Sequence, residues 1–540
     1  MAIEAKDSIY STFAAAAARW GDRPFLHAPA DAIGTPEAFD RDFGDAAEEV
    51  EALRRRYEIL GYGFGHRIGL ALDNHPQFFL HLLALNALGA SVVPINSAMR
   101  AEELAAILGM ADLDLVVSWP KHFGGFGTAQ GIALCFVPLA PASLDGCPAA
   151  SRPVRDGRAG ADDEAAMLFT SGTTGRPKGC VLSNAYFTWI GDFYANLGGY
   201  CAFREGEDRI LTPLPVNHMN AIACSFMAAI MTGSCLIQLD RFHASRWWRT
   251  VRETRASVIH YLGVMPAILL QRAEDEASGL PVRFGFGAGV DPRHHAAFET
   301  RFGFPLIEAW AMTETGAAAW ITANREPRHV GTRCFGKAPA HLEARVADDK
   351  GNALADGEAG ELLVRARGDD PRLHFFTAYY KDAAATDEAW AGGWFHTGDV
   401  VRRDDEGNFY FVDRNKNIVR RSGENIAAVE VEGVLMQHPA VAACAVLPVE
   451  DELRGEEVMA LVLLAEGAGD ATLAADIVNH CLDRLAYFKA PGYVAFVDQL
   501  PTTASQKLQR GEIRTLGRAL HATGNAHDLR TRKRGLRAVG

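Results

Sequence analysis

A glycine-rich segment at residues 167–179, MLFTSGTTGRPKG, leaves this chain few alternatives in fold or chemistry. Its first residues, Met167 to Phe169, are apolar and predict a short buried strand. The three glycines that follow let the backbone approach an anion, while hydroxyl groups and a lysine add donors and positive charge. A polar turn would explain three or four such residues, but not a run of this length. We therefore predict a phosphate-binding loop whose nucleotide-binding residues are Thr170, Ser171, Gly172, Thr173, Thr174, Gly175 and Lys178.

The loop is not of the Walker type, because Pro177-Lys178-Gly179 stands where a Gly-Lys-Ser/Thr ending is required. It resembles the phosphate-binding signature of the adenylate-forming (ANL) superfamily, which includes acyl-CoA synthetases, peptide-synthetase adenylation domains and beetle luciferases. The resemblance implies an α/β fold with a large N-terminal lobe of wound α/β sheets and a small mobile α+β C-terminal domain. On that basis we expect an AMP-binding domain at 1–412, a hinge at 413–416 and a lid domain with the catalytic lysine at 417–540.

The order of secondary structure in the N-terminal part agrees with this fold class. After expected helices at 8–20 and 36–60, strand and helix patterns alternate between residues 67 and 118 with short loops, as in a wound α/β sheet. The apolar run at 222–231 predicts one continuous helix. Residues 27–45 do not follow the superfamily's usual pattern and receive no role.

A second motif, EAWAMTET, supplies groups that an ATP site needs. Trp310 offers a flat apolar surface for the base, Thr313 a hydroxyl at the α-phosphate and Glu314 an oxygen ligand for Mg²⁺. An ordinary loop with one acid is the alternative, but the run resembles the superfamily's aromatic-Gly-Met-Thr-Glu motif. Trp310 replaces the common tyrosine, and Ala309 and Ala311 replace glycines. We therefore expect the base to sit differently and the acyl pocket beside it to be narrower.

Two charged residues near the end of the large lobe are candidates for the ribose site. Asp399 matches a superfamily residue that accepts hydrogen bonds from the ribose hydroxyls, a role that suits a carboxylate. Arg414 matches one that bridges ribose and phosphate, a role that suits an arginine. An aspartate after Thr-Gly is usually a turn residue, so this assignment depends on the combination of motifs. By the same resemblance Asp413 and Lys416 belong to the hinge, with Lys416 at the pivot.

The acyl pocket is assigned by resemblance to segments that follow predicted strands. A histidine at a strand-to-helix junction, as His218 is, more often caps or packs than reacts. In the superfamily this position borders the acyl group, so His218 is a candidate for catalytic contact with the carboxylate or the adenylate. The resemblance adds Met219, Val264, Gly287 and Gly289 to the pocket.

The C-terminal part carries two further candidates. Lys507 lies in a segment that resembles the superfamily's lysine loop, and a mobile cation suits the charge that develops as a carboxylate attacks the α-phosphate. A surface lysine is normally only solvated, and Gln506 stands where glycine is usual, although the lysine stays in register. Gly423 lies in SGENI, which resembles the acyl-CoA synthetase segment lining the pantetheine tunnel, and is the CoA-binding candidate.

Together these motifs predict an acid–thiol ligase, an AMP-forming acyl-CoA synthetase that uses ATP, Mg²⁺, coenzyme A and a small carboxylic acid. The chain also resembles carnitine- and crotonobetaine-CoA ligases. The alternatives are an adenylation enzyme that loads a carrier-protein thiol, a non-catalytic nucleotide-binding homologue and a luciferase-like oxygenase. No carrier-like domain follows Lys507, which favours free CoA, and the joint retention of the motif residues argues against a non-catalytic protein.

Composition limits the expected partners and compartment. The 54 basic and 67 acidic residues leave a net charge of −13, which argues against a nucleic-acid-binding surface. Nine cysteines without a CxxC pair predict reduced thiols in a cytoplasmic protein. No apolar run approaches the roughly 18 residues of a membrane span, so we expect none and no signal peptide. The basic tail, which includes Arg530, Arg532, Lys533, Arg534 and Arg537, is expected to be disordered or to pack on a neighbour. A homo-oligomer remains an alternative to a monomer.

Overall fold

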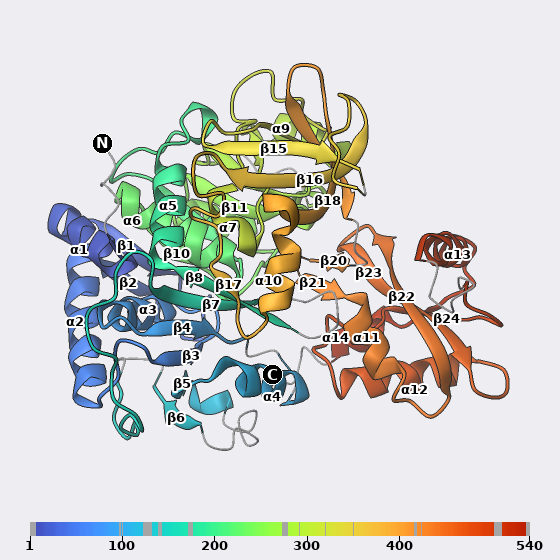
Figure 1. Ribbon diagram of the computed structural model, residues 1–540, viewed down its shortest axis with the longest axis horizontal. Helices are drawn as coiled ribbons and strands as arrows, with labels where there is room; N and C mark the ends of the chain where they lie inside the picture. The colour runs from blue at the N-terminus through green and yellow to red at the C-terminus, as the bar shows by residue number, and fades with distance from the viewer. Residues whose placement is uncertain are drawn as a thin grey trace. The chain divides into compact units, whose positions relative to one another are not determined.

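The chain divides into two compact units in a computed structural model (Figure 1). The large unit comprises Met1–Ser97, Leu108–Phe169 and Gly179–Asp413, and the small unit comprises Ala98–Ile107, Thr170–Lys178 and Arg414–Gly540. The residues that the structure describes are 7–96, 99, 101–122, 132–138, 143–170, 177–272, 279–290, 292–318, 320–348, 350–414, 418–422, 424–501 and 510–535.

A seven-stranded sheet of the large unit carries the predicted acyl-pocket segments. Its order is β13 (Leu306–Glu308), β12 (Phe284–Ala288), β11 (Val258–Leu262), β9 (Arg209–Thr212), β10 (Cys235–Gln238), β1 (Pro24–Ala28) and β2 (Phe39–Asp42). The strands from β13 to β1 run parallel. Parallel strands covered on both faces are mostly apolar, and β10 shows this pattern: all four of its residues are buried, and only the last, Gln238, is polar.

Residues 27–45 form the edge of this sheet. β2 pairs antiparallel with β1, and Asp42 then caps α2 by accepting a hydrogen bond from the N–H of Asp45. The expected helix at 36–60 is therefore wrong in its first part, because Phe39 pairs with Ala28 across the hairpin. A local helical pattern cannot reveal that pairing.

A second seven-stranded sheet carries the flanks of the predicted phosphate loop. Its order is β17 (Ala378–Tyr379), β8 (Lys178–Ser183), β7 (Glu164–Thr170), β4 (Ser91–Pro94), β3 (Arg67–Ala71), β5 (Leu115–Ser118) and β6 (Ala133–Phe136). β7, β4, β3, β5 and β6 are parallel neighbours, whereas β17 pairs antiparallel with β8. The predicted alternation of strands and helices between residues 67 and 118 is confirmed.

Helices join and cover the two sheets. Those of the large unit are α1 (Ile9–Trp20), α2 (Phe43–Ile59), α3 (Gln77–Ala87), α4 (Ala101–Ala111), α5 (Asn184–Ala195), α6 (Phe226–Thr232), α7 (Trp247–Glu253), α8 (Val264–Leu270), α9 (Pro292–Phe302), α10 (Ala383–Ala389) and the short helices η2 (Gly199–Cys201), η3 (Asn220–Ser225), η5 (Thr313–Ala318) and η6 (Ala391–Gly393), with the first part of α4 belonging to the small unit. α3 is mostly apolar and is buried on all sides from Gln77 to Asn86. Phe79 on it stacks on Phe226 of α6 with ring centroids 4.4 Å apart. Among the described helices none is long and apolar enough to cross a bilayer.

The apolar run at 222–231 does not form one continuous α-helix. It begins as the π-helix η3 and becomes α-helical at Phe226. The Ser225 hydroxyl lies 2.5 Å from Nδ1 of the buried His260 on β11, a contact that ties the junction to the sheet. π-helical turns are frequent at functional sites, and this one follows His218.

A five-stranded sheet completes the large unit and positions Asp399. Its order is β14 (Cys334–Lys337), β19 (Asn408–Arg414), β18 (Phe395–Arg403), β16 (Ala359–Ala366) and β15 (Leu342–Ala347). β15, β16 and β18 pair antiparallel, and β14 pairs antiparallel with β19.

The small unit is built on one sheet with helices on both faces. The sheet runs β21 (Glu424–Ala427), β20 (Ile418–Arg421), β23 (Gly455–Leu464), β24 (Tyr493–Phe496) and β25 (His527–Asp528), with β22 (Val441–Asp451) also paired to β23. The helices are α11 (Ala428–Leu435), α12 (Ala471–Leu482), α13 (Arg510–Ala522) and α14 (Arg530–Gly535). Val446 and Ala460 face the core with α11 and α12, whereas Leu447 and Met459 face α13, which is the alternation of a strand pair buried on both sides.

The basic tail was expected to be disordered or to pack on a neighbour, and for residues 530–535 that expectation is wrong. They form α14, and Lys533 is buried with its Nζ 2.6 Å from Oε1 of Glu457. Nε of Arg421 donates to the same carboxylate at 2.8 Å. Burial lowers the pKa of Lys533 to about 7 in spite of the neighbouring Glu457.

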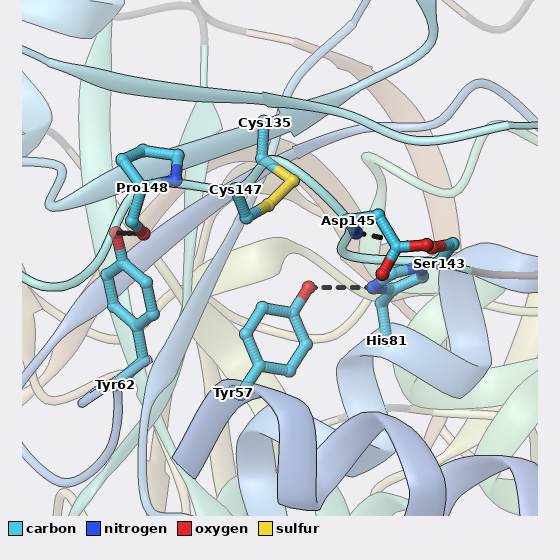
Figure 2. Close-up of a disulfide and its surroundings, with 8 residues drawn as sticks. All are labelled: Tyr57, Tyr62, His81, Cys135, Ser143, Asp145, Cys147 and Pro148. Carbon is cyan, nitrogen blue, oxygen red and sulfur yellow. Dashed lines mark hydrogen bonds between the residues drawn. A yellow bond between two sulfur atoms is a disulfide. The ribbon is translucent and has the colours of Figure 1, made fainter. Parts of the chain in front are cut away.

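A disulfide joins Cys135 at the end of β6 to Cys147, where the sequence predicted reduced thiols (Figure 2). The two Cα atoms lie 4.7 Å apart because the segment after residue 143 returns past the edge of the sheet. The hydroxyl of Tyr62 donates to the carbonyl of Pro148 at 3.1 Å and helps to hold that return. The other seven cysteines are buried, which agrees with the prediction that they are not part of a disulfide framework.

Candidate active site

The predicted site residues of the first sheet follow the carboxyl ends of its parallel strands. β9 leads into the segment with His218, β12 into Gly289, and β13 into Trp310. Ligands of open parallel sheets bind at this edge, because loops from several strands converge there.

The predicted phosphate loop connects two strands that pack tightly. β7 ends at Thr170 and β8 begins at Lys178. A Cβ atom at Gly179 would lie 2.7 Å from Sδ of Met167, so a side chain there would displace the methionine side chain that packs from β7. The predicted loop residues that lie outside the described residues are Ser171, Gly172, Thr173, Thr174 and Gly175.

The structure brings Trp310 and Asp399 together. The indole Nε1–H of Trp310 donates to Oδ2 of Asp399 at 2.9 Å. Asp399 is 1% exposed and Trp310 is 5% exposed. The indole stacks on Phe335, with ring centroids 6.2 Å apart, and meets Trp320 edge to face. The expected base platform and the expected ribose carboxylate thus form one hydrogen-bonded pair in the core of the large unit.

Glu314 is held by a tyrosine that sequence reasoning missed. Its Oε1 accepts a hydrogen bond from the hydroxyl of Tyr379 at 2.9 Å, and its backbone carbonyl accepts from the N–H of Phe376. Glu314 is 6% exposed. Burial, and next the charge of Glu314, raise the pKa of Tyr379 well above its usual value, so the hydroxyl stays a donor at neutral pH. Thr313 precedes it at the start of η5, where its carbonyl accepts from the hydroxyl of Tyr186.

The segment that leads to His218 is anchored by two side chains that the sequence did not single out. The amide of Gln238 donates to the carbonyls of Thr212 and Leu214 at 3.4 and 3.2 Å. Oδ1 of Asn74 accepts from the N–H of Val216 at 3.0 Å. Gln238 ends β10 and Asn74 follows β3 of the other sheet, so only the pairing of β9 with β10 and the packing of the two sheets bring them here. Met219, the next predicted pocket residue after His218, is buried.

A buried carboxylate shapes the glycine turn of the predicted acyl pocket. Glu308 accepts hydrogen bonds from the N–H groups of Gly289 and Val290, each at 2.9 Å, and burial raises its pKa. Gly289 has φ +79°, and a Cβ at Gly287 would lie 2.1 Å from the carbonyl oxygen of Tyr261. The positive φ therefore favours glycine at position 289, and the contact with a backbone oxygen requires glycine at position 287. Val264, the remaining predicted pocket residue, begins α8, and its side chain is not described.

The remaining predicted site residues belong to the junction and the small unit. Asp413 and Arg414 end β19, and the division between the two compact units falls between them. The hinge itself stays a prediction. The site residues outside the described residues are Lys416, Gly423 and Lys507. Within the described residues no group of three or more His, Cys, Asp or Glu side chains is arranged to hold a metal ion.

Comparison with known proteins decides the family. A sequence profile described as AMP-binding enzyme matches residues 13–369, and one described as AMP-binding enzyme C-terminal domain matches residues 430–507. The chain belongs to the AMP-binding enzyme family. This AMP-binding enzyme is 32% identical over 526 residues to sulfoacetate–CoA ligase from Cupriavidus necator, covering 94% of this chain and 97% of the relative. It is 30% identical over 510 residues to crotonobetaine/carnitine–CoA ligase from Citrobacter koseri, covering 87% and 93%.

Solved structures share the fold of this AMP-binding enzyme. The o-succinylbenzoate CoA synthetase from Bacillus subtilis aligns with a TM-score of 0.78 at 22% identity, over 93% of this chain and 98% of that one. A malonyl-CoA ligase bound to methylmalonyl-CoA and AMP aligns with a TM-score of 0.71 at 24% identity, over 89% and 97%. The predicted ANL fold class is confirmed, and so is the predicted reaction class, an AMP-forming, ATP-dependent acyl-CoA ligase.

Proposed function

We propose that this enzyme activates a short carboxylic acid bearing a second charged group and transfers the acyl group to free CoA. The observation that carries the nucleotide-binding part of the proposal is the hydrogen bond between Trp310 and Asp399, because it joins the proposed ribose carboxylate on β18 to the segment that continues into Thr313 and Glu314. The relatives support the substrate class, since sulfoacetate and carnitine are both short acids with a second charge. Both relatives are named as CoA ligases, which supports free CoA over a carrier-protein thiol.

The first half-reaction forms the acyl-adenylate. A carboxylate oxygen of the substrate attacks the α-phosphorus of ATP, the bond from that phosphorus to the bridging oxygen breaks, and pyrophosphate leaves. Asp399 accepts hydrogen bonds from the ribose hydroxyls, and the hydroxyl of Thr313 donates a hydrogen bond to the α-phosphate. Lys178, at the end of the phosphate loop, and Lys507 balance the charge that develops on the phosphate oxygens.

The second half-reaction forms the thioester. The sulfur of CoA, after loss of its proton to water, attacks the acyl carbon, and the bond between that carbon and the phosphate oxygen breaks to release AMP. His218 and the turn at Gly287 and Gly289 border the acyl group, and Gly423 lines the path of CoA. Between the two steps, a rotation at Asp413–Lys416 withdraws Lys507 from the reacting groups and presents Gly423 to them.

The residues present fit Mg²⁺, which prefers oxygen ligands and is usually held by one or two carboxylates together with substrate phosphates. Glu314 is one buried carboxylate, and the hydrogen bond from Tyr379 orients it, as second-shell donors do for metal ligands. When bound, Mg²⁺ would neutralise phosphate charge.

ATP–pyrophosphate exchange tests the proposal, because adenylation precedes attack by CoA and needs none. The panel contains sulfoacetate, carnitine, crotonobetaine and malonate, with uncharged short-chain, long-chain and aromatic acids as controls. We expect exchange with at least one short acid that bears a second charge, and consumption of the CoA thiol with the same acid. Exchange with only long-chain or aromatic acids would contradict the substrate class, and exchange with no acid would contradict the ligase assignment.

A further inference from the structure

The pairing of Trp310 with Asp399 has a chemical consequence for nucleotide binding. Asp399 is the proposed ribose ligand, and it is almost completely buried, so the donors around it decide where its oxygens point. Nε1–H of Trp310 meets Oδ2 at 2.9 Å. This hydrogen bond leaves Oδ1 outside the contact with the indole.

Both partners are held independently of each other. Trp310 forms a backbone bridge with Trp320, in which each N–H donates to the other's carbonyl at 2.8 Å, and its ring stacks on Phe335. The N–H of Asp399 donates to the hydroxyl of Thr397 at 3.0 Å, and that hydroxyl donates onward to a carbonyl of β16 at 2.7 Å. The indole N–H is thus a fixed donor aimed at a fixed carboxylate.

A tyrosine at this position could not make the same contact. Tyrosine carries its single donor at the far end of the ring, whereas the indole nitrogen lies within the ring system, closer to the backbone. With only 5% of its surface exposed, Trp310 is itself mostly occupied by core contacts with Phe335 and Trp320. Its hydrogen bond to Asp399 therefore links it to the proposed ribose site.

We propose that Trp310 is a positioning residue that orients Asp399 for the ribose hydroxyls, so that this enzyme discriminates strongly between ribonucleotides and nucleotides that lack those hydroxyls. The inference rests on the proposed function, in which Asp399 binds the ribose. A carboxylate already oriented toward the ribose favours a ligand with hydroxyl groups, because such a ligand adds hydrogen bonds to a charged acceptor that a ligand without hydroxyl groups cannot supply.

Calorimetric titration of the full-length enzyme with AMP and with 2′,3′-dideoxy-AMP tests the proposal. Trp310→Phe keeps an aromatic ring and removes the N–H. A hydrogen bond to a charged group is lost, so we expect about tenfold weaker binding of AMP. Binding of the dideoxy analogue, which has no hydroxyl for Asp399, should change less than about twofold. The preference for AMP then shrinks by roughly the same tenfold factor.

Trp320→Phe is the matched control. Trp320 is buried in the same aromatic cluster, its ring centroid 6.2 Å from that of Trp310, but its Nε1–H donates to the carbonyl of Lys337. We expect this variant to lower the melting temperature without changing the preference for AMP. Equal weakening of AMP and the dideoxy analogue in Trp310→Phe would show a structural role and overturn the proposal.

A double-mutant cycle with Asp399→Ala separates action through Asp399 from direct contact. If Trp310 acts through Asp399, Trp310→Phe has little further effect on AMP binding once Asp399 is alanine. Additive losses would overturn the proposal. Absence of acid-dependent pyrophosphate exchange in the wild-type enzyme would contradict the proposed function. Normal exchange in the wild-type enzyme, together with an unchanged preference for AMP over the dideoxy analogue in Trp310→Phe, would overturn only the role of Trp310.

Discussion

Replacing Tyr379 with phenylalanine removes one hydroxyl group from the carboxylate that we assign to Mg²⁺. The ring keeps its contact with Phe376, whose centroid lies 4.8 Å away, and the backbone pairing of β17 with β8 does not involve the side chain. The lost interaction is a 2.9 Å hydrogen bond to the buried Glu314. A hydrogen bond to a charged group contributes about 1.5–3 kcal/mol, and loss of a second-shell partner typically lowers metal affinity about 10–100-fold.

We therefore expect the Mg²⁺ concentration for half-maximal exchange to rise at least about tenfold in Tyr379→Phe, with a smaller change in the KM for the acid. The assay is ATP–pyrophosphate exchange at fixed ATP and acid over a range of Mg²⁺. Tyr380→Phe is the control, because its hydroxyl donates to the exposed Asp112 rather than to Glu314. An unchanged Mg²⁺ dependence in a stably folded Tyr379→Phe enzyme, or an equal shift in Tyr380→Phe, would refute the reasoning.

Three further predictions follow from other parts of the chain. Burial lowers the pKa of Lys533 from 10.5 to about 7. Between these pH values the unfolded chain binds more protons than the folded protein, so the free energy of unfolding should rise with pH, by at most about 1.4 kcal/mol per pH unit. Lys533→Met, in which Arg421 still pairs with Glu457, should flatten that dependence in denaturant unfolding at pH 7.5 and 9. Reducing the disulfide, which spans 12 residues, should lower the free energy of unfolding by about 2–3 kcal/mol, with no effect of reductant on a variant that lacks both cysteines. Lys507→Ala should slow adenylation about 10²–10³-fold while conversion of supplied acyl-AMP to thioester survives; equal loss in both half-reactions would contradict its catalytic role.

The fold class and the reaction class were accessible from the sequence because they depend on patterns within short stretches. Ser8 caps α1, and the apolar periodicity between residues 67 and 118 specifies the alternation of β3, α3, β4, α4 and β5. The order of motifs around the phosphate loop and Glu314 was enough to identify the superfamily. Where the local pattern was overridden, a distant partner was responsible, as when β1 converted Phe39–Asp42 from expected helix into strand.

The contacts that give these residues their chemistry came only with the tertiary structure. Trp310 and Asp399 are 89 residues apart, and Glu314 and Tyr379 are 65 apart. Each pair meets because separate strands and turns are brought together by sheet pairing and core packing. A hydrogen bond needs its two atoms within about 3 Å, whereas a sequence pattern reports only on neighbours a few residues away. The sequence could therefore name the residue types of the site, but only the packed chain decided which donor orients which carboxylate.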